Sequence, residues 1–380
     1  MSPRERDSVG TFEDLHAAAT RACGLSDFGP EEYVEPLRVL LAAYESTAGL
    51  TPLGNAETRG WVRGALTARL LSEAAFHRTP EVLQTPVERP VFVVGIQRSG
   101  TTLLQRLLHA APDAQGLEMW LTQLPQPRPP RETWDDDPVF SLLKAAVDQH
   151  HQDNPDLAGI HFVAADMVEE DWQLIRQSMT TEAWVYLAHV PAYAEWLRTA
   201  DRVPAYERFR RNLQLIGSAD PDKRWVLKNP SHLASLPALF EVFPDALVVQ
   251  THRDPLTTVP SACSLSATST RGWSTVFTSE VIGQTILRQQ AAEVAAAREA
   301  RRHLPEKQVL DVQYDDLVAD PVGTARWVHE SFDLPWDDEM ESAITRDYEA
   351  SRQGPRRPRH DYSLEEYGLT EAQVRAAFEG

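Results

Sequence analysis

Apolar residues along the first 80 positions recur with the spacing of amphipathic helices. In each of two segments they fall three or four residues apart, so each segment presents one apolar stripe. The positions are Leu37, Leu40, Leu41 and Tyr44 in the first segment and Val62, Leu66, Leu70 and Ala74 in the second. Pro80, Pro86 and Pro90 then end the helical pattern. We therefore predict an N-terminal helical extension over residues 1–88 and a second unit over residues 89–380.

Beyond Pro90 the pattern changes to short apolar runs of strand length. The runs are Val91–Val94, Trp225–Leu227, Ala246–Gln250 and Gln308–Val312. Helical patterns separate them, and the predicted helices include Met167–Ser178, Tyr206–Gly217 and Ile282–Arg302. Four prolines between residues 121 and 137 predict an irregular loop or lid there. Because short buried strands alternate with helices, we predict an α/β fold whose parallel sheet is covered by helices on both faces.

Composition and charge narrow the class of protein. The 380 residues include 37 Lys and Arg against 56 Asp and Glu, a net charge of −19. Such a surface repels nucleic acid and anionic membranes, so we expect neither as a partner, and an anionic ligand needs a local cationic site. No signal peptide or membrane-length apolar run is readable, and Cys23 and Cys263 are too few for a disulfide framework. We therefore expect a cytoplasmic protein.

The sharpest functional signal is the segment Gly95–Thr102, with the sequence Gly-Ile-Gln-Arg-Ser-Gly-Thr-Thr. It lies between the first strand and an apolar helix. In this arrangement the backbone N–H groups of the loop and the positive end of the helix dipole point at the same place, which is suited to binding a phosphate group. The spacing is that of a P-loop, but Thr101 stands where nucleotide-hydrolysing P-loops have Lys. The nearby cation is Arg98 instead. We predict a P-loop-type sheet whose loop binds an anion other than a triphosphate.

A second candidate motif follows the third predicted strand. Asp254 and Pro255 have the pattern of a helix N-cap and first helical residue, so Arg253 lies just outside a helix N-terminus. Ser261 lies eight residues after Arg253, two turns along that helix. An isolated Arg at such a place is more often a surface ion-pair partner than a ligand. Its combination with Gly95–Thr102 favours a second anion site.

The two motifs together resemble those of the sulfotransferases that use 3′-phosphoadenosine 5′-phosphosulfate (PAPS). The bacterial branch related to tyrosylprotein sulfotransferases is the most similar, because the animal cytosolic enzymes have Lys in place of Arg98. Other segments that look like this branch are Glu169–Trp172, Trp225–Pro230, Tyr314–Pro321 and His360–Leu369. The resemblance implies PAPS as co-substrate and adenosine 3′,5′-bisphosphate as product. It implies 5′-phosphosulfate binding by Gln97, Arg98, Ser99, Gly100, Thr101 and Thr102, and 3′-phosphate binding by Arg253 and Ser261.

Physical reasoning then suggests how the sulfuryl group is transferred. Charge spreads over the equatorial oxygens and collects on the leaving oxygen, so fixed cations supply much of the acceleration. Arg98 and Lys228 are the natural pair, because Lys228 ends the second predicted strand at the edge where the loop opens. The resemblance also places a Lys of this Lys-x-Pro context at the transferred group. The alternative is a solvated lysine at a strand end. We expect no metal, since one sulfuryl group and two separate phosphates lack the contiguous charge of a triphosphate.

The acceptor hydroxyl also needs a general base. Glu118 sits where the tyrosylprotein branch has its catalytic Glu, so the resemblance implies that role. The alternative for Glu118 is a structural partner of Arg98. His232 and His161 are rival bases, because the animal cytosolic enzymes use His, although a lone His is more often structural.

A late basic cluster is conspicuous in so acidic a chain; it consists of Arg352, Arg356, Arg357, Arg359 and His360. In the wider superfamily a late basic segment folds over the 3′-phosphate, which implies a binding role for Arg356 and Arg357. A solvated cationic loop is the equal alternative.

The leading hypothesis is a sulfotransferase that moves a sulfuryl group from PAPS to a hydroxyl or similar acceptor of a small molecule. A P-loop kinase of small molecules is the first alternative. Such an enzyme requires Lys at position 101, where this chain has Thr, and an Asp at a strand end that holds Mg²⁺. The second alternative is an inactive nucleotide-binding module that serves interactions. The identity of the acceptor and the oligomeric state are not readable from the sequence.

Overall fold

The computed structural model describes residues 5–153, 162–352 and 362–379. Within these ranges the chain forms one five-stranded sheet in which every pair is parallel, with the strand order β2-β3-β1-β4-β5. The strands are β1 (Val91–Val94), β2 (Ala114–Gln115), β3 (Arg224–Lys228), β4 (Leu247–His252) and β5 (Val309–Gln313). The predicted α/β fold is confirmed. The added strand β2 has only two residues, too few for a hydrophobic pattern to reveal.

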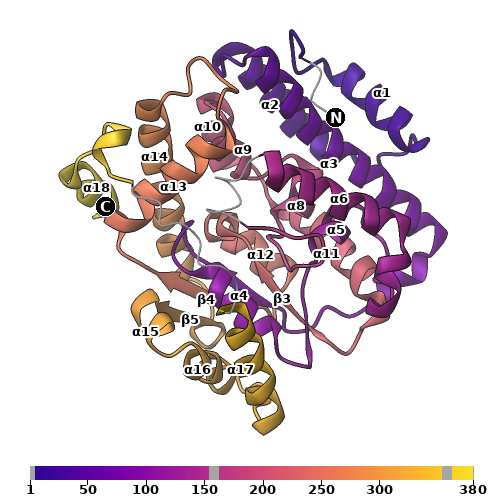
Figure 1. Ribbon diagram of the computed structural model, residues 1–380, viewed down its shortest axis with the longest axis vertical. Coiled ribbons are helices and arrows are strands. Elements are labelled where there is room, and N and C mark those ends of the chain that lie inside the picture. The colour runs from indigo at the N-terminus through magenta and orange to yellow at the C-terminus, as the bar shows by residue number, and fades with distance from the viewer. Residues whose placement is uncertain (1–4, 154–161, 353–361, 380) are drawn as a thin grey trace.

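Helices cover both faces of the sheet because both faces are apolar. Alternate residues of a strand point to opposite faces, and in β1 all four are buried. Phe92 and Val94 belong to a core with the helices α11 (Val203–Ile216), α12 (Leu236–Val242) and α14 (Ser279–Arg301). Val91 and Val93 belong to a core with α4 (Thr101–His109), α16 (Pro321–Ser331) and α17 (Asp338–Arg352). In Figure 1, α16 and α17 lie below the strands and α11 and α12 lie above them.

The helices of the second unit vary widely in length. They are α4 (Thr101–His109), α5 (Met119–Gln123), α6 (Pro138–Asp153), α8 (Trp172–Ile175), α9 (Ala183–Leu187), α10 (Pro191–Thr199), α11 (Val203–Ile216), α12 (Leu236–Val242), α13 (Pro255–Ser269), α14 (Ser279–Arg301), α15 (Tyr314–Ala319), α16 (Pro321–Ser331), α17 (Asp338–Arg352) and α18 (Glu371–Phe378). None of the described helices is long and apolar enough to cross a membrane.

The region predicted to be an N-terminal extension contains α1 (Phe12–Cys23), α2 (Val34–Thr47) and α3 (Pro52–Arg78). These helices lie along one side of the molecule, shown in indigo to purple in Figure 1. Their apolar stripes share a core with residues of the second unit, among them Met179, Trp184 and Tyr193. The extension therefore packs through apolar side chains against the region of α9 and α10.

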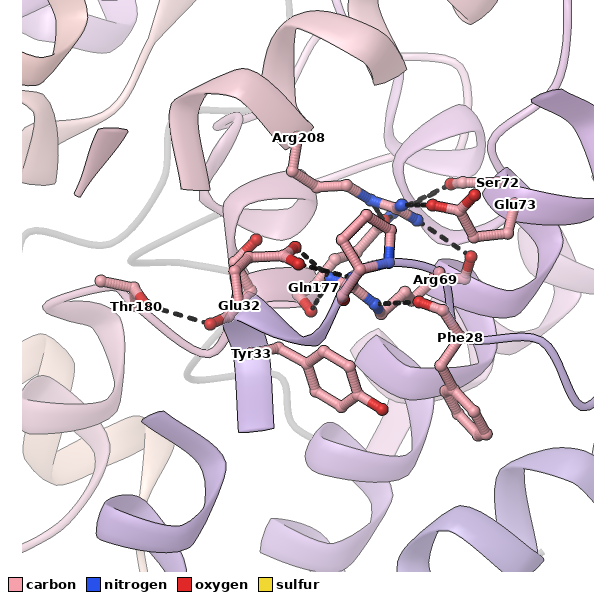
Figure 2. Close-up of polar contacts among 12 residues, drawn as sticks. Phe28, Glu32, Tyr33, Arg69, Ser72, Glu73, Gln177, Thr180 and Arg208 are labelled. Atoms are coloured by element: carbon pink, nitrogen blue, oxygen red, sulfur yellow. Dashed lines mark hydrogen bonds and ion pairs between the residues drawn. The ribbon is translucent and has the colours of Figure 1, made fainter. Parts of the chain in front are cut away.

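A buried polar network also connects the extension to the second unit. Arg208 on α11 forms an ion pair with Glu73 on α3 and donates from Nε to Oε1 of Gln177 at 3.1 Å (Figure 2). Arg69 donates to the two carboxylate oxygens of Glu32 at 2.6 and 3.0 Å. Burial, with the charge of Arg69, lowers the pKa of Arg208 to about 9. Since buried charges require partners, these contacts fix α3 against α11.

One predicted helix is wrong over most of its length. Of the range Met167–Ser178, only Trp172–Ile175 is α-helical, followed by a short 3₁₀ turn. Part of the preceding segment instead pairs with residues 117–119: Glu169 donates its N–H to the carbonyl of Leu117 at 2.8 Å, and Met119 donates its N–H to the carbonyl of Met167 at 2.9 Å. Pairing between segments far apart in sequence overrides the helical pattern here.

Candidate active site

The loop Gly95–Gly100 joins β1 to α4 and needs glycine at both ends. Gly95 has φ 147°, and a Cβ there would lie 2.4 Å from Oγ1 of Thr251. Gly100 has φ 98°, and a Cβ there would lie 2.8 Å from the ring of Tyr314. Arg98 also has positive φ, at 72°, which is costly for a residue with a side chain. The close packing therefore fixes the loop in one conformation.

The loop leaves the first turn of α4 open to a ligand. Gly100 is the N-cap, and no side chain caps this helix. The hydroxyl of Ser99 is engaged elsewhere, since it donates to the carbonyl of Ile96 at 2.6 Å and lies 2.7 Å from the hydroxyl of Thr251. The N–H groups at Thr101 and Thr102 thus keep the arrangement that binds phosphate at a helix N-terminus.

The two predicted anion motifs are in direct contact. Nε of Arg98 donates to Oγ of Ser261 at 3.0 Å, and Nη1 of Arg253 donates to the carbonyl oxygen of Arg98 at 3.0 Å. The guanidinium of Arg253 also stacks on the ring of Tyr314, 3.8 Å from its centroid. The structure therefore brings Arg98, Arg253 and Ser261 together at the carboxyl edge of the sheet.

This junction concentrates positive charge. Burial lowers the pKa of Arg98 below its usual value and nearby Arg253 lowers it further, while Tyr362, Glu170 and Tyr314 act in the opposite direction. Within the described part of the chain, neither Arg98 nor Arg253 forms an ion pair with a carboxylate. Two guanidinium groups beside an uncapped helix N-terminus provide the local cationic site that a protein of net charge −19 needs to hold an anion.

Lys228 ends β3 at the same edge of the sheet. Its side chain is only 1% exposed, and its Nζ donates to Oε1 of Glu170 at 2.7 Å. Glu170 belongs to the extended segment that precedes α8. The solvated-lysine alternative is therefore wrong, because Lys228 is a buried, paired cation.

The segment that carries Glu170 is anchored to the sheet. The N–H of Asp171 donates to the carbonyl of Lys228 at 3.1 Å. The Asp171 carboxylate lies 2.9 Å from Nε2 of His232, and Nδ1 of His232 lies 2.6 Å from the hydroxyl of Tyr206. His232 is completely buried. Both ring nitrogens of His232 therefore have partners within the protein.

Glu118 precedes α5 and faces a different arginine from the one expected. Its Oε2 accepts from Nε of Arg128 at 3.2 Å, and Nη1 of Arg128 lies 3.3 Å from Asp220, which precedes β3. Burial raises the pKa of Glu118, and Arg128 partly offsets that effect. The expected alternative, a partnership with Arg98, is thus corrected to a partnership with Arg128. Its catalytic role stays a prediction.

Several predicted residues lie outside the described ranges. They are His161, Arg356, Arg357, Arg359 and His360. Arg352 is described and exposed at the end of α17, with its guanidinium 5.7 Å from the ring centroid of Tyr348.

Sequence reasoning missed three side chains around the site. Glu170 belongs to the segment Glu169–Trp172, which resembles the family, but nothing in the sequence indicates that its carboxylate contacts Lys228. Tyr314 comes two residues after the end of the fourth predicted strand, Gln308–Val312, so its position near the carboxyl edge of the sheet was predictable. Arg128 lies in the Pro-rich segment, and no local pattern links it to Glu118.

The α/β fold thus brings a P-loop-like turn, a helix N-terminus and clustered cations together at the carboxyl edge of its sheet, an arrangement suited to an anionic group. The sequence profile of the sulfotransferase family matches residues 90–338, well over half of the chain. The chain belongs to the sulfotransferase family.

Two solved structures extend the similarity over nearly the whole chain. Sulfotransferase STF1 from Mycobacterium tuberculosis H37Rv is 48% identical with a TM-score of 0.92, covering 98% of this chain and 99% of that one. Sulfotransferase STF9 from Mycobacterium avium is 28% identical with a TM-score of 0.86, covering 99% and 96%. The predicted family is therefore confirmed.

A curated relative matches over a shorter segment. The omega-hydroxy-beta-dihydromenaquinone-9 sulfotransferase Stf3 of Mycobacterium bovis and of Mycobacterium tuberculosis is 27% identical over 270 residues, which are 64% of this chain and 63% of the relative. The match thus spans just under two thirds of that relative's length.

Proposed function

We propose that this protein transfers a sulfuryl group from PAPS to a hydroxyl group of a small molecule. The observation that carries the proposal is the junction of Arg98, Arg253 and Ser261 beside the uncapped N-terminus of α4. In this proposal the N-terminus of α4 is one anion site and Arg253 with Ser261 is another beside it, which suits a nucleotide with phosphate groups at both its 5′ and 3′ positions.

Each of the two motifs binds a different end of the donor nucleotide. The backbone of Gln97, Ser99, Gly100, Thr101 and Thr102 holds the 5′-phosphosulfate at the positive end of α4. Arg253 and Ser261 hold the 3′-phosphate, and the stacking of Arg253 on Tyr314 fixes its orientation. Arg356 and Arg357 complete the 3′ side in this proposal, which rests for them on sequence alone.

Arg98 and Lys228 stabilise the group in transfer. The two cations stabilise the negative charge that develops on the sulfuryl oxygens and the leaving oxygen. Because both cations are already in place, the protein needs little reorganisation during the reaction. Burial of Lys228 strengthens its electrostatic effect because water screens it poorly. Glu118, although paired with Arg128, is the base that family resemblance proposes for the acceptor proton.

For the acceptor, the curated relative supplies the first hypothesis. Its name describes a hydroxylated dihydromenaquinone, which carries a hydroxyl group on an apolar molecule. We therefore choose farnesol, an isoprenoid alcohol, and 2-naphthol, a phenol, as first acceptors. We further propose a cytoplasmic location, in keeping with only two cysteines among 380 residues.

The test is transfer of ³⁵S from labelled PAPS to these acceptors and to water. We expect labelled organic sulfate, or labelled inorganic sulfate from hydrolysis, to accumulate with time and enzyme concentration. Absence of any release from PAPS would contradict the proposal and favour an inactive nucleotide-binding module.

The kinase alternative gains no support from the site. Thr101 replaces the P-loop lysine, and the carboxylate of Asp254 after β4 caps α13 by accepting the N–H of Leu256 at 2.9 Å. Incubation of the same acceptors with γ-labelled ATP should therefore yield no labelled product.

A further inference from the structure

Two partly exposed tryptophans lie beside the proposed transfer centre. Trp172 begins α8, two residues after Glu170, whose carboxylate accepts from Nζ of Lys228 at 2.7 Å. The indole of Trp172 stacks on that of Trp61 from α3, with 5.5 Å between the ring centroids and 29° between the ring planes. Both residues keep part of their surface exposed. The N-terminal extension and the second unit thus build one aromatic surface together, which we call the Trp61–Trp172 pair.

A buried arginine supports this pair. Arg176 is 2% exposed, and the central carbon of its guanidinium lies 5.0 Å from the ring centroid of Trp61 and 5.4 Å from that of Trp172. Its Nη2 donates to Oε1 of Gln123 at 2.7 Å. Among the described residues no carboxylate offsets its charge, and burial lowers the pKa of Arg176 to about 9. Since a desolvated cation needs partners, the cation–π contacts stabilise Arg176 and fix the orientation of both indoles.

Packing in an apolar core does not account for Trp172. Trp120 and Trp184 are at most 1% exposed and belong to such cores. Trp172 belongs to none of the cores that the described residues form, and its ring contacts there are Trp61 and Arg176. A large apolar side chain that is held in place, partly exposed and close to the reacting groups is typical of a residue that binds a ligand.

We propose that the Trp61–Trp172 pair binds the aromatic ring of an acceptor, so that the enzyme selects aromatic hydroxyl compounds; this inference rests on the proposed function. Residues two apart in the chain lie within about 7 Å of each other. A ring stacked on Trp172 can therefore extend its hydroxyl toward the group that Lys228 stabilises. Aromatic rings gain from stacking beyond the burial of their area, whereas a saturated ring of the same size does not.

The first test uses 2-naphthol and its saturated analogue decahydro-2-naphthol, which differ in the aromatic ring system. Each is titrated calorimetrically into protein saturated with adenosine 3′,5′-bisphosphate, so that acceptor binding is measured without turnover. Wild type should bind 2-naphthol about three- to tenfold more tightly than the saturated analogue. Equal affinity for the two compounds would overturn the inference.

The second test replaces the aromatic surface. Trp172→Leu keeps an apolar side chain that cannot stack, so its affinity for 2-naphthol should fall about three- to tenfold, while its affinity for decahydro-2-naphthol should change by less than twofold. In transfer of ³⁵S from PAPS, KM for 2-naphthol should rise more than kcat falls. Trp61→Leu should act in the same direction, and Trp172→Phe should restore most of the preference.

Trp327→Leu is the matched control, because Trp327 is 43% exposed on α16, which packs on the face of the sheet opposite to α8. It should keep the wild-type preference. Circular dichroism and the affinity for adenosine 3′,5′-bisphosphate check that each variant is folded. Equal losses of affinity for both compounds in Trp172→Leu would also overturn the inference. Wild-type protein that releases no ³⁵S from PAPS would instead overturn the proposed function itself.

Discussion

Substitution of Arg253 should weaken the binding of the nucleotide. Its guanidinium stacks on Tyr314 and bonds to the carbonyl of Arg98, so it is held in place before any ligand arrives. A charge-assisted contact to phosphate contributes roughly 1.5–3 kcal/mol. Arg253→Ala should therefore weaken adenosine 3′,5′-bisphosphate binding about tenfold or more in calorimetry. Adenosine 5′-monophosphate lacks the 3′-phosphate and should lose little; equal losses for both would remove Arg253 from the 3′ site.

Lys228 should affect the reaction more than the binding of product. It acts on charge that develops during transfer, so Lys228→Ala should lower turnover with PAPS far more than it lowers affinity for adenosine 3′,5′-bisphosphate. Arg98→Ala should behave in the same way. Lys223→Ala is the control, because Lys223 lies before β3 and pairs with Asp220 on the surface. Parallel losses of turnover and affinity would mean that Lys228 only holds the nucleotide.

The positions of the cationic residues of the site could be predicted from the sequence, but the partners of the carboxylates could not. Arg98, Arg253 and Lys228 follow strand ends, and parallel strands bring such positions to one edge. The orientation of a carboxylate depends on loops that the sequence pattern does not determine. Glu118 therefore faces Arg128, while Glu170 reaches Lys228 from a segment predicted to be helical.

Among the elements, α9 and α14 meet through a buried carboxyl group. The hydroxyl of Tyr186 on α9 donates to Glu293 on α14 at 3.1 Å, and Gln289 donates to it at 3.0 Å. Burial, with the nearby charge of Glu182, raises the pKa of Glu293 from 4.5 to about 8. The folded state thus binds more protons than the unfolded state between these values, so this group's contribution to stability falls as pH rises from about 4.5 to about 8.

Glu293→Gln should remove that pH dependence, because Gln stays neutral and can still accept the hydrogen bond from Tyr186. Differential scanning calorimetry of variant and wild type at pH 5.5, 7 and 9 measures the effect. The Tm of the variant relative to that of wild type should become more favourable as the pH rises. A constant difference across this range would show that the pKa of Glu293 is not raised in the folded state.

Most elements were predictable because their patterns are local. The four longer strands and the helices α2 and α3 follow from apolar runs and stripes, and caps such as Asp254 mark the ends of elements. Strand β2 was missed because two residues carry no pattern. The helix predicted at Met167–Ser178 failed because backbone pairing with residues 117–119 is a long-range contact.

Over the whole molecule, the N-terminal extension is bound to the second unit by a buried ion pair. Glu73→Gln would leave Arg208 buried without its charged partner, and breaking such a pair costs about 3–5 kcal/mol. Urea denaturation should show a loss of stability of that order. Glu371→Gln removes an exposed partner of Arg375 and should cost less than about 0.5 kcal/mol. Equal effects would mean that the buried pair does not hold the extension.

We propose that this protein, despite its net charge of −19, uses one edge of its sheet to bind a nucleotide with both 5′ and 3′ phosphate groups. Calorimetric titration of the wild-type protein with adenosine 3′,5′-bisphosphate, and with ATP under the same conditions, tests this directly. We predict that the bisphosphate binds at least tenfold more tightly without added Mg²⁺, because Arg253 and Ser261 have no partner on ATP. Equal or tighter binding of ATP would contradict the account.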